Sequence, residues 1–310
     1  MKPELVTIPC NRVFYAFDPG IPPAAHATPG SLVLFCTQDA LGGQVKSEED
    51  LVTSVDFSRV NPATGPLYVE GAEPGDALAV RILSVKTAEK GFIVVAPGAG
   101  ALPRRVREAK TRTCRIVGDY VEVLGFKLPA WKMIGVIGVA SSSKPPTGTP
   151  GRHGGNLDTK FITEGATVYL PVEYKGALLG VGDLHALMAH GEVCVSACEV
   201  PGSVLAEVDV VKGLAPAWPL VEFADSTYIL VSKDTIQEAL EAAVEVAVEA
   251  LSIALNLEWH DAYIVASLAA DVGVSQLVDP RKTAWVRIPK HLAPTHSILK
   301  ALAELRTRGF

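Results

Sequence analysis

The chain has 310 residues, of which 48% are hydrophobic, so it can bury a sizeable core and is not a disordered polymer. Its net charge of −6 excludes a broad basic surface for nucleic acid. Five scattered cysteines, an N-terminus without an apolar segment and the lack of an apolar run of about 18 residues predict a reducing, cytoplasmic setting without a signal peptide or membrane span.

Residues 1–135 have the pattern of many short strands. Runs rich in Val, Ile and Leu alternate with turns that contain Pro, Gly and Asp, as at Pro29-Gly30 and Pro74-Gly75. Four such runs lie at residues 31–38, 66–85, 91–98 and 120–128. This spacing favours a sandwich or barrel over a sheet built from βαβ units.

The middle of the chain begins with a polar loop, residues 141–165, which is rich in Gly and Pro. Long loops of this kind are usually functional or disordered. A second block of strands follows, and residues 177–183 and 192–200 resemble buried strands.

The helices are expected near the C-terminus. Apolar residues follow helical spacing from Asp234 to about Asn256, and Asp234 with Gln237 has the pattern of a capping box. Two further helices are predicted at residues 259–270 and 296–310. Strands first and helices later indicate an α+β, predominantly β fold, with antiparallel sandwich- or barrel-like sheets and a smaller C-terminal α+β part.

Three regions are expected to form one compact unit. They are an N-terminal β-rich region (1–135), a central β region that carries two polar motifs (136–225) and a C-terminal helical region (226–310).

The densest group of ligand-type side chains lies in the motif GDLHALMAHGE, residues 182–192. If a strand ends near Asp183, then Asp183 and His185 are two residues apart and point to the same face. His190 and Glu192 repeat this spacing. A carboxylate and an imidazole at one sheet edge indicate a divalent-metal site. The alternative is a polar connection between strands with solvated side chains, which would have the same sequence pattern.

The motif GGNLD adds Asn156 and Asp158, which are again two residues apart. Asp158 could ligate the same metal, and Asn156 could orient a substrate carbonyl or a water. The alternative is a Gly-Gly turn with local side-chain hydrogen bonds, and the motif alone does not separate the two.

Three other features are weaker candidates. Asp39 precedes a Gly pair after a strand, so it is either a ligand or a turn residue. Ser141–Lys144 has the letters of a Ser-Ser-Lys amidase, but the lysine is adjacent rather than well upstream. Cys194 and Cys198 fit core packing best, although their closeness to the polar motif keeps a nucleophile role open. No G-x-S-x-G elbow or phosphate-binding loop occurs.

Four stretches resemble the acetamidase/formamidase family: CTQDALGGQ, NPATGPLYVEGAEPGDAL, the long run from GGNLD to CEV at residues 154–200, and residues 267–289. The resemblance implies hydrolysis of formamide or acetamide to a carboxylate and ammonia. It also implies a β-rich fold, a divalent metal and a homo-oligomer, here expected as a dimer or trimer. The family's acidic and histidine residues fall on the following positions: Asp39, Asp158, Asp183, His185 and Glu192.

The chain departs from the family pattern at Ala189-His190, where relatives read Gly-Asp. An imidazole there could replace a carboxylate ligand and shift the preference towards zinc, act as a base, or do neither. Beside GGNLD, His153 is expected at the rim of the site, where it would tune specificity.

These expectations give a mechanism for a small amide substrate. A divalent metal, zinc first and calcium or another ion second, is expected among Asp158, Asp183 and His185, with Asp39 or His190 nearby. Other residues are expected to carry out catalysis. Glu192 would act as the base, and Asn156 with the Gly154 and Gly155 amides would donate hydrogen bonds to the oxyanion. Two alternatives remain: a hydrolase of cyclic amides (lactams or imides), and a non-catalytic metal- or ligand-binding β protein.

Overall fold

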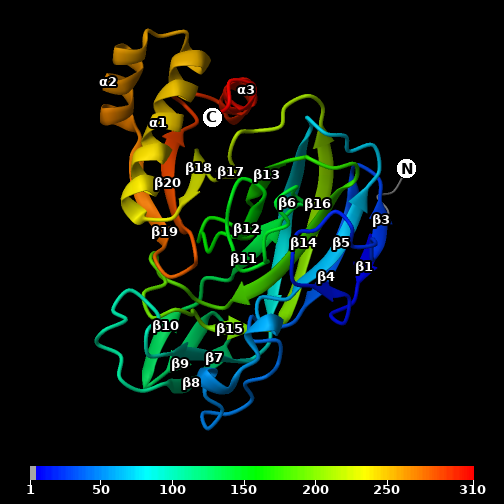
Figure 1. The fold of residues 1–310 in the computed structure, drawn as a ribbon, viewed down its shortest axis with the longest axis vertical. Helices are drawn as coiled ribbons and strands as arrows, with labels where there is room; N and C mark the ends of the chain where they lie inside the picture. The colour runs from blue at the N-terminus through cyan, green and yellow to red at the C-terminus, as the bar shows by residue number, and fades with distance from the viewer. Residues whose placement is uncertain (1–4) are drawn as a thin grey trace.

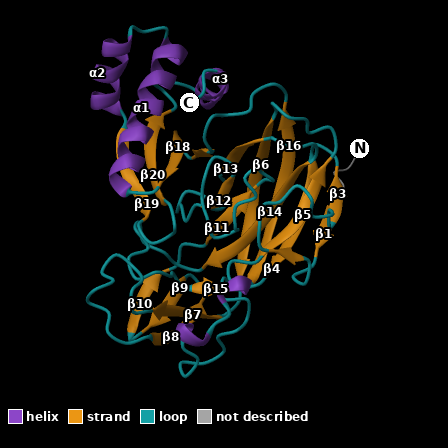
Figure 2. Cartoon of the chain, in the orientation of Figure 1, coloured by secondary structure: helices purple, strands orange, loops and turns teal. Residues whose placement is uncertain are grey.

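The computed structural model describes residues 5–310, and two large β-sheets dominate it (Figures 1 and 2). The nine-stranded sheet runs in the order β1 (Leu5–Ile8), β4 (Ser31–Thr37), β16 (Gly202–Val211), β6 (Ala77–Thr87), β13 (Thr167–Pro171), β17 (Leu220–Phe223), β18 (Ser226–Lys233), β20 (Lys282–Pro289), β19 (Asp271–Gln276). The other sheet runs in the order β10 (Phe126–Pro129), β9 (Tyr120–Val123), β8 (Lys110–Val117), β7 (Lys90–Val95), β15 (Glu199–Val200), β14 (Ala177–His185), β11 (Met133–Gly138), β12 (Gly154–Asn156). Three strands attach through β14: β5 (Ala63–Val69), β2 (Val13–Phe14) and β3 (Ala25–Ala27).

Strand pairing in the described chain is antiparallel except between β1 and β4 and between β3 and β5. The predicted α+β, mainly antiparallel class is therefore confirmed. The nine-stranded sheet takes strands from each of the three expected regions, since β6, β13, β17 and β18 are consecutive neighbours in it.

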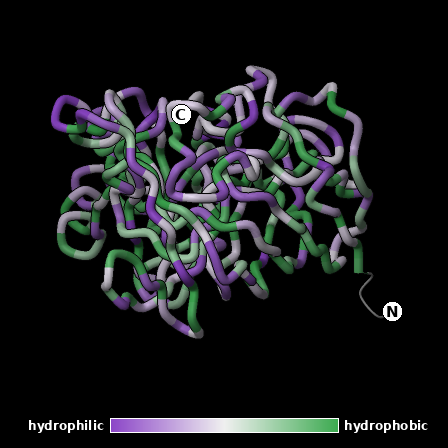
Figure 3. Tube along the Cα trace, turned by 90° about the horizontal axis from the view of Figure 1, so that it is seen from below, coloured by the Kyte–Doolittle hydropathy of each residue, from purple (hydrophilic) through white to green (hydrophobic). Residues whose placement is uncertain are grey.

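The main core lies between the two sheets. Phe35 and Ile82 project into it from the nine-stranded sheet, and Ile137, Leu179 and Val181 project from the other, all of them fully buried. Burying a side chain of this size contributes about 1.5–3 kcal/mol. Hydrophobic positions recur throughout the described residues (Figure 3), and the core combines distant segments from Ile8 to Leu230.

The helices gather at one end of the molecule, away from β7–β10 (Figure 2). They are α1 (Ile236–Leu255), α2 (Trp259–Ala269) and α3 (Thr295–Thr307), close to the predicted positions. α1 packs on β18 and β20. No helix of residues 5–310 is long and apolar enough to cross a membrane.

The start of α1 corrects one local prediction. The capping box is formed by Thr235 and Glu238, one residue after the predicted pair Asp234 and Gln237. Asp234 instead pairs with Arg281 at 3.1 Å. Asp234 with Gln237 and Thr235 with Glu238 both satisfy the capping-box pattern, so the sequence alone does not show which residue begins the helix.

The strand predicted at residues 192–200 is largely wrong. Only Glu199–Val200 pair as β15, and residues 193–198 are turns, bends and irregular chain. Cys194 and Cys198 therefore do not share a strand face; Cys198 is buried and Cys194 is partly buried, and both are free thiols. The strand predicted at residues 177–183 is confirmed as β14.

Candidate metal centre and active site

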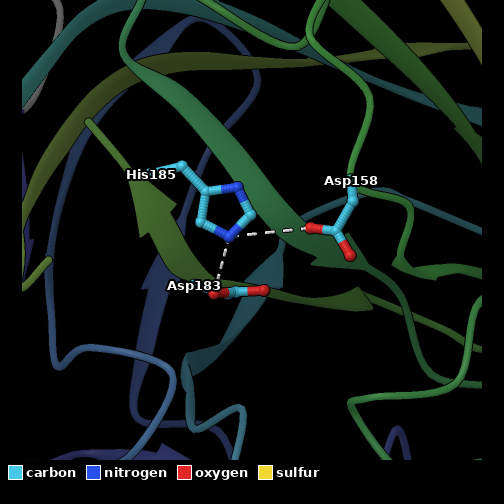
Figure 4. A group of neighbouring side chains, drawn as sticks. All are labelled: Asp158, Asp183 and His185. Atoms are coloured by element: carbon cyan, nitrogen blue, oxygen red, sulfur yellow. Dashed lines mark hydrogen bonds and ion pairs between the residues drawn. The ribbon is translucent and has the colours of Figure 1, made fainter. Parts of the chain in front are cut away.

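The centre of the site is the His185 side chain at the end of β14. His185 Nε2 lies 3.2 Å from Asp183 Oδ1 and 3.2 Å from Glu199 Oε2. The same nitrogen is 3.8 Å from Asp158 Oδ1 and 3.9 Å from Glu192 Oε1. Figure 4 shows the carboxylates of Asp158 and Asp183 converging on the imidazole. Four acidic side chains thus surround one nitrogen in a buried site.

Strand pairing explains part of this convergence. Asp183 and His185 are two residues apart on β14, and their hydrogen-bond distance confirms that they point to one side. β15 pairs antiparallel with β14, and Glu199 stands directly opposite His185. The loop before Glu192 is tied to β19, because Gly191 donates its N–H to the Ser275 carbonyl at 2.7 Å.

Burial makes the charged forms of three of the acids in this site unfavourable. Burial and the charge of Asp183 raise the pKa of Asp158 to about 6. Burial raises the pKa of Glu199 to about 8 and that of Glu192 well above its usual value. Burial opposes the cationic form of His185, but Glu199 and Asp183 raise its pKa well above the ordinary value. These raised pKa values mean that protonation limits the negative charge around the imidazole, whereas a bound divalent cation would favour the ionised forms of the acids.

The backbone at three of these acids is held in an uncommon conformation. Asp158, Asp183 and Glu192 all have positive φ, at 41°, 53° and 47°. Each such residue costs on the order of 1 kcal/mol or more, and such residues cluster at functional sites. The surrounding strands therefore hold these carboxylates in place at the expense of local stability.

The residues present fit a divalent cation. Both carboxylate oxygens of Asp158 are buried without a hydrogen-bond partner, and Glu199 Oε2 lacks one too. Two overlapping groups can each offer ligand atoms within 4.8 Å of one another: Asp158, Asp183, His185 and His185, Glu192, Glu199. Imidazole nitrogen with carboxylate oxygen is a donor set suited to zinc, while the excess of oxygen also suits harder ions.

Gly135 on β11 provides the space in which two carboxylates meet. A Cβ at this position would lie 2.4 Å from Asp158 Oδ1 and 2.5 Å from Asp183 Oδ2, closer than real Cβ atoms approach. We expect Gly135→Ala to push these carboxylates apart and to weaken zinc binding about tenfold or more, measured by calorimetric titration of metal-stripped protein.

The matched control for that variant is Gly20→Ala. Gly20 is exposed, and an added Cβ would meet only the end of the Asp18 side chain at 3.2 Å. Gly20→Ala should bind zinc like the wild type. Equal affinity of both variants would contradict the role of Gly135.

Asn156 is buried beside the carboxylates and differs from its expected role. Its Nδ2 donates to Asp279 Oδ2 at 3.0 Å, whereas its Oδ1 has no partner. The free atom of Asn156 is therefore an acceptor, which suits an amide N–H better than an oxyanion. Burial and the charge of Asp158 raise the pKa of Asp279 well above its usual value.

The two glycines of GGNLD serve close backbone packing. Gly154 and Gly155 have φ of 95° and 90°, and a Cβ would overlap the Ile137 carbonyl at Gly154 and the Thr149 carbonyl at Gly155. The Gly154 N–H already donates to the Gly151 carbonyl at 3.1 Å. That amide is engaged within the chain and is not a free oxyanion donor.

His153 is not at a solvent rim but buried, with its ring 5.0 Å from that of Phe17. Burial and the charge of Arg281 lower its pKa to about 4. Below pH 6.5, the ordinary pKa of histidine, the unfolded chain takes up a proton on His153 that the folded chain does not bind. This residue therefore makes the protein less stable as the pH falls from 6.5 towards 4.

We expect the free energy of unfolding of the wild type to fall, between pH 7 and pH 5, by about 2 kcal/mol more than that of His153→Gln. Urea titrations at both pH values measure this difference. Because the comparison subtracts the titration of all other groups, an identical pH dependence in the two proteins would contradict the burial of a neutral imidazole.

Asp39 and His190 do not join the ligand groups. Asp39 Oδ1 accepts the N–H groups of Leu41 and Gly43, so it holds a turn, although burial raises the pKa of this carboxyl. His190 is exposed, with its ring 5.1 Å from that of Phe161. The expectation that His190 and Glu192 point to the same side, like two residues of one strand, is wrong. His190 is exposed and Glu192 is buried, because the chain turns here rather than continuing as a strand.

Two acids of the site are missing from the sequence-based set: Glu199 and Asp279. Glu199 follows Cys198 in a segment read as an apolar strand, and only its pairing with β14 places it against His185. Asp279 lies in the β19–β20 connection, 123 positions from its partner Asn156. Its one local signal is an Asp-Pro turn, which is common in loops.

Both the sequence and the fold of this chain are similar to known proteins. The profile of the acetamidase/formamidase family matches residues 9–149 and 145–292. A crystal structure of a predicted acetamidase/formamidase from Thermoanaerobacter tengcongensis is 39% identical with a TM-score of 0.91, covering 95% of this chain and 99% of that one. The acetamidase structure from Bacillus halodurans is 40% identical with a TM-score of 0.88, covering 92% and 98%.

A curated formamidase from Methylophilus methylotrophus is 28% identical, and the match covers 65% of this chain and 65% of that relative. The chain spans slightly less than two thirds of the length of the curated relatives it matches. The family profile covers most of the chain, and the fold agrees across nearly its whole length. This chain therefore belongs to the acetamidase/formamidase family.

Proposed function

We propose that the protein hydrolyses carboxylic amides to a carboxylate and ammonia, with a divalent cation, zinc first, as cofactor. The observation that carries this proposal is the single imidazole nitrogen of His185 surrounded by four buried acidic side chains, three of which also line a cavity: Asp183, Glu192 and Glu199. Family membership supports the amide as substrate, since the relatives include proteins named formamidase and acetamidase.

Asp158, Asp183 and His185 would hold the cation, with Glu199 adjoining them. A bound divalent cation supplies Lewis-acid polarisation of the amide carbonyl and makes water more acidic. Neither oxygen of Asp158 accepts a hydrogen bond from an N–H or hydroxyl group, which supports a cation at these side chains.

Glu192 is the general base of this proposal. Its carboxylate is buried, lines the cavity and lies near Asp158, while Glu199 is anchored because its Oε1 accepts the Ala197 N–H at 2.7 Å. Glu192 takes a proton from the attacking water and returns it to the leaving nitrogen. Burial raises the pKa of this carboxyl, and a cation bound beside it would favour the ionised form that accepts the proton.

Asn156 positions the substrate amide. Asn156 lines the cavity, and its buried Oδ1 has no partner and can accept an N–H from the substrate –NH₂, while the bond from Nδ2 to Asp279 fixes its orientation. This arrangement would present the carbonyl carbon to the attacking water in one orientation.

The test combines metal content with product formation. Protein stripped by a chelator should release ammonia from formamide and acetamide slowly, and zinc should restore the rate. A lactam such as 2-pyrrolidinone, assayed by the appearance of a primary amine, checks the cyclic-amide alternative. Full activity in protein with verified metal loss would refute the cofactor, and no amide turnover in metal-loaded protein would refute the function.

A further inference from the structure

The carboxylate site opens into a cavity much larger than the amides that the family is named for. The cavity measures about 640 Å³, and Asn156, Asp183, Glu192 and Glu199 line it. This space would hold roughly twenty water molecules at the volume of liquid water. Formamide carries no carbon beyond its carbonyl, and acetamide carries only a methyl group, so either would leave most of the cavity to water.

The remaining walls of the cavity are largely apolar. Leu41, Val52 and Val94 line it and also pack with one another in a small buried cluster. Phe57, in the short 3-10 helix Phe57–Arg59 of the β4–β5 connection, lines the same cavity although 64% of this residue is exposed. A phenylalanine that the fold leaves this exposed beside a cavity can gain burial from a bound apolar group.

The charge of the lining selects against ionic substrates. The residues that line this cavity in the described chain include no Lys, Arg or His, whereas four acids line it: Asp183, Glu192, Glu199 and Asp279. A substrate carboxylate or phosphate would find no cation of the chain to pair with, and its burial would be unfavourable. The acyl group that fits these walls is therefore uncharged and apolar.

We propose that the substrates of this protein are primary amides with an apolar acyl group of several carbons or an aromatic ring, which rests on the proposed amide hydrolysis. The –CONH₂ group lies at the carboxylates and Asn156. The acyl group lies against Leu41, Val52 and Phe57. Bond changes are those of simple hydrolysis: water adds to the carbonyl carbon, the C–N bond breaks, and ammonia leaves.

The experiment is a series of kcat/KM measurements with zinc-loaded protein on formamide, acetamide, butyramide, hexanamide and benzamide. Each methylene that the cavity buries contributes up to about 0.8 kcal/mol, or about fourfold. We expect kcat/KM to rise about ten- to a hundredfold from acetamide to hexanamide, with benzamide also above acetamide.

Phe57→Ser tests the wall directly. This variant should lower the ratio of kcat/KM for hexanamide to that for acetamide about fivefold or more. Phe126→Ser is the matched control, because Phe126 is 66% exposed on β10 and does not line the cavity; it should keep the ratio of the wild type. Val60→Trp, which narrows the cavity, should lower the same ratio if Phe57→Ser fails to fold.

The outcomes separate the two proposals. If formamide and acetamide are hydrolysed but kcat/KM falls with chain length, this inference is overturned and the proposed function stands. An unchanged hexanamide ratio in both cavity variants also overturns it. If no amide is turned over by zinc-loaded protein, both proposals fail.

Discussion

Replacing Glu192 by glutamine is expected to lower kcat for amide hydrolysis by about 10²- to 10⁴-fold, because the proton of the attacking water loses its acceptor. Glutamine has the same shape and keeps a carbonyl oxygen but cannot take up a proton. Zinc content should remain near that of the wild type. The measurement is steady-state ammonia release with metal analysis of the same preparation.

Two further variants sharpen this result. Glu245→Gln makes the same chemical change on the exposed face of α1 and should leave kcat unchanged. Glu199→Gln tests the other cavity-lining glutamate, whose pKa burial raises to about 8. If Glu199→Gln abolished turnover while Glu192→Gln stayed within a few-fold, Glu199 would be the base. Loss of zinc from Glu192→Gln would instead make Glu192 a ligand.

The second large effect is expected from Asp158→Asn, which should weaken zinc binding about a hundredfold or more and abolish measurable turnover at limiting zinc. Removing a residue that only hydrogen-bonds to a metal ligand typically weakens metal binding 10- to 100-fold. Removing a direct ligand should therefore weaken it at least as much. Asparagine also tolerates the positive φ of 41° at this position, so the backbone need not change.

Stability makes this prediction more specific. Burial and Asp183 raise the pKa of Asp158 to about 6, so at pH 7 its charge opposes folding when no cation is present. Metal-stripped Asp158→Asn should therefore unfold at the same temperature as the stripped wild type or at a higher one, and added zinc should raise its Tm little. Asp209→Asn, on an exposed strand position, is the control. A lower Tm of the stripped Asp158→Asn protein would show a structural role instead.

The general outline of the fold could be predicted from the chain. Alternating short apolar runs and Gly/Pro turns predict mainly antiparallel sheets, and the 3.6-residue periodicity places α1 within two residues of its start. Both signals are local, because each depends on side chains a few positions apart. Segment 192–200 failed for the same reason: its apolar letters do not show that the chain turns before pairing as β15.

The sequence by itself determined the fold class, the family resemblance and the pairing of Asp183 with His185 at two-residue spacing. These are local facts, since a strand fixes which neighbours share a face. Only the tertiary structure decided that Glu192 points inward and His190 outward, and that Glu199 and Asp279 complete the site. Cross-strand register and loop docking bring these groups together over long sequence separations, and no local pattern encodes that register.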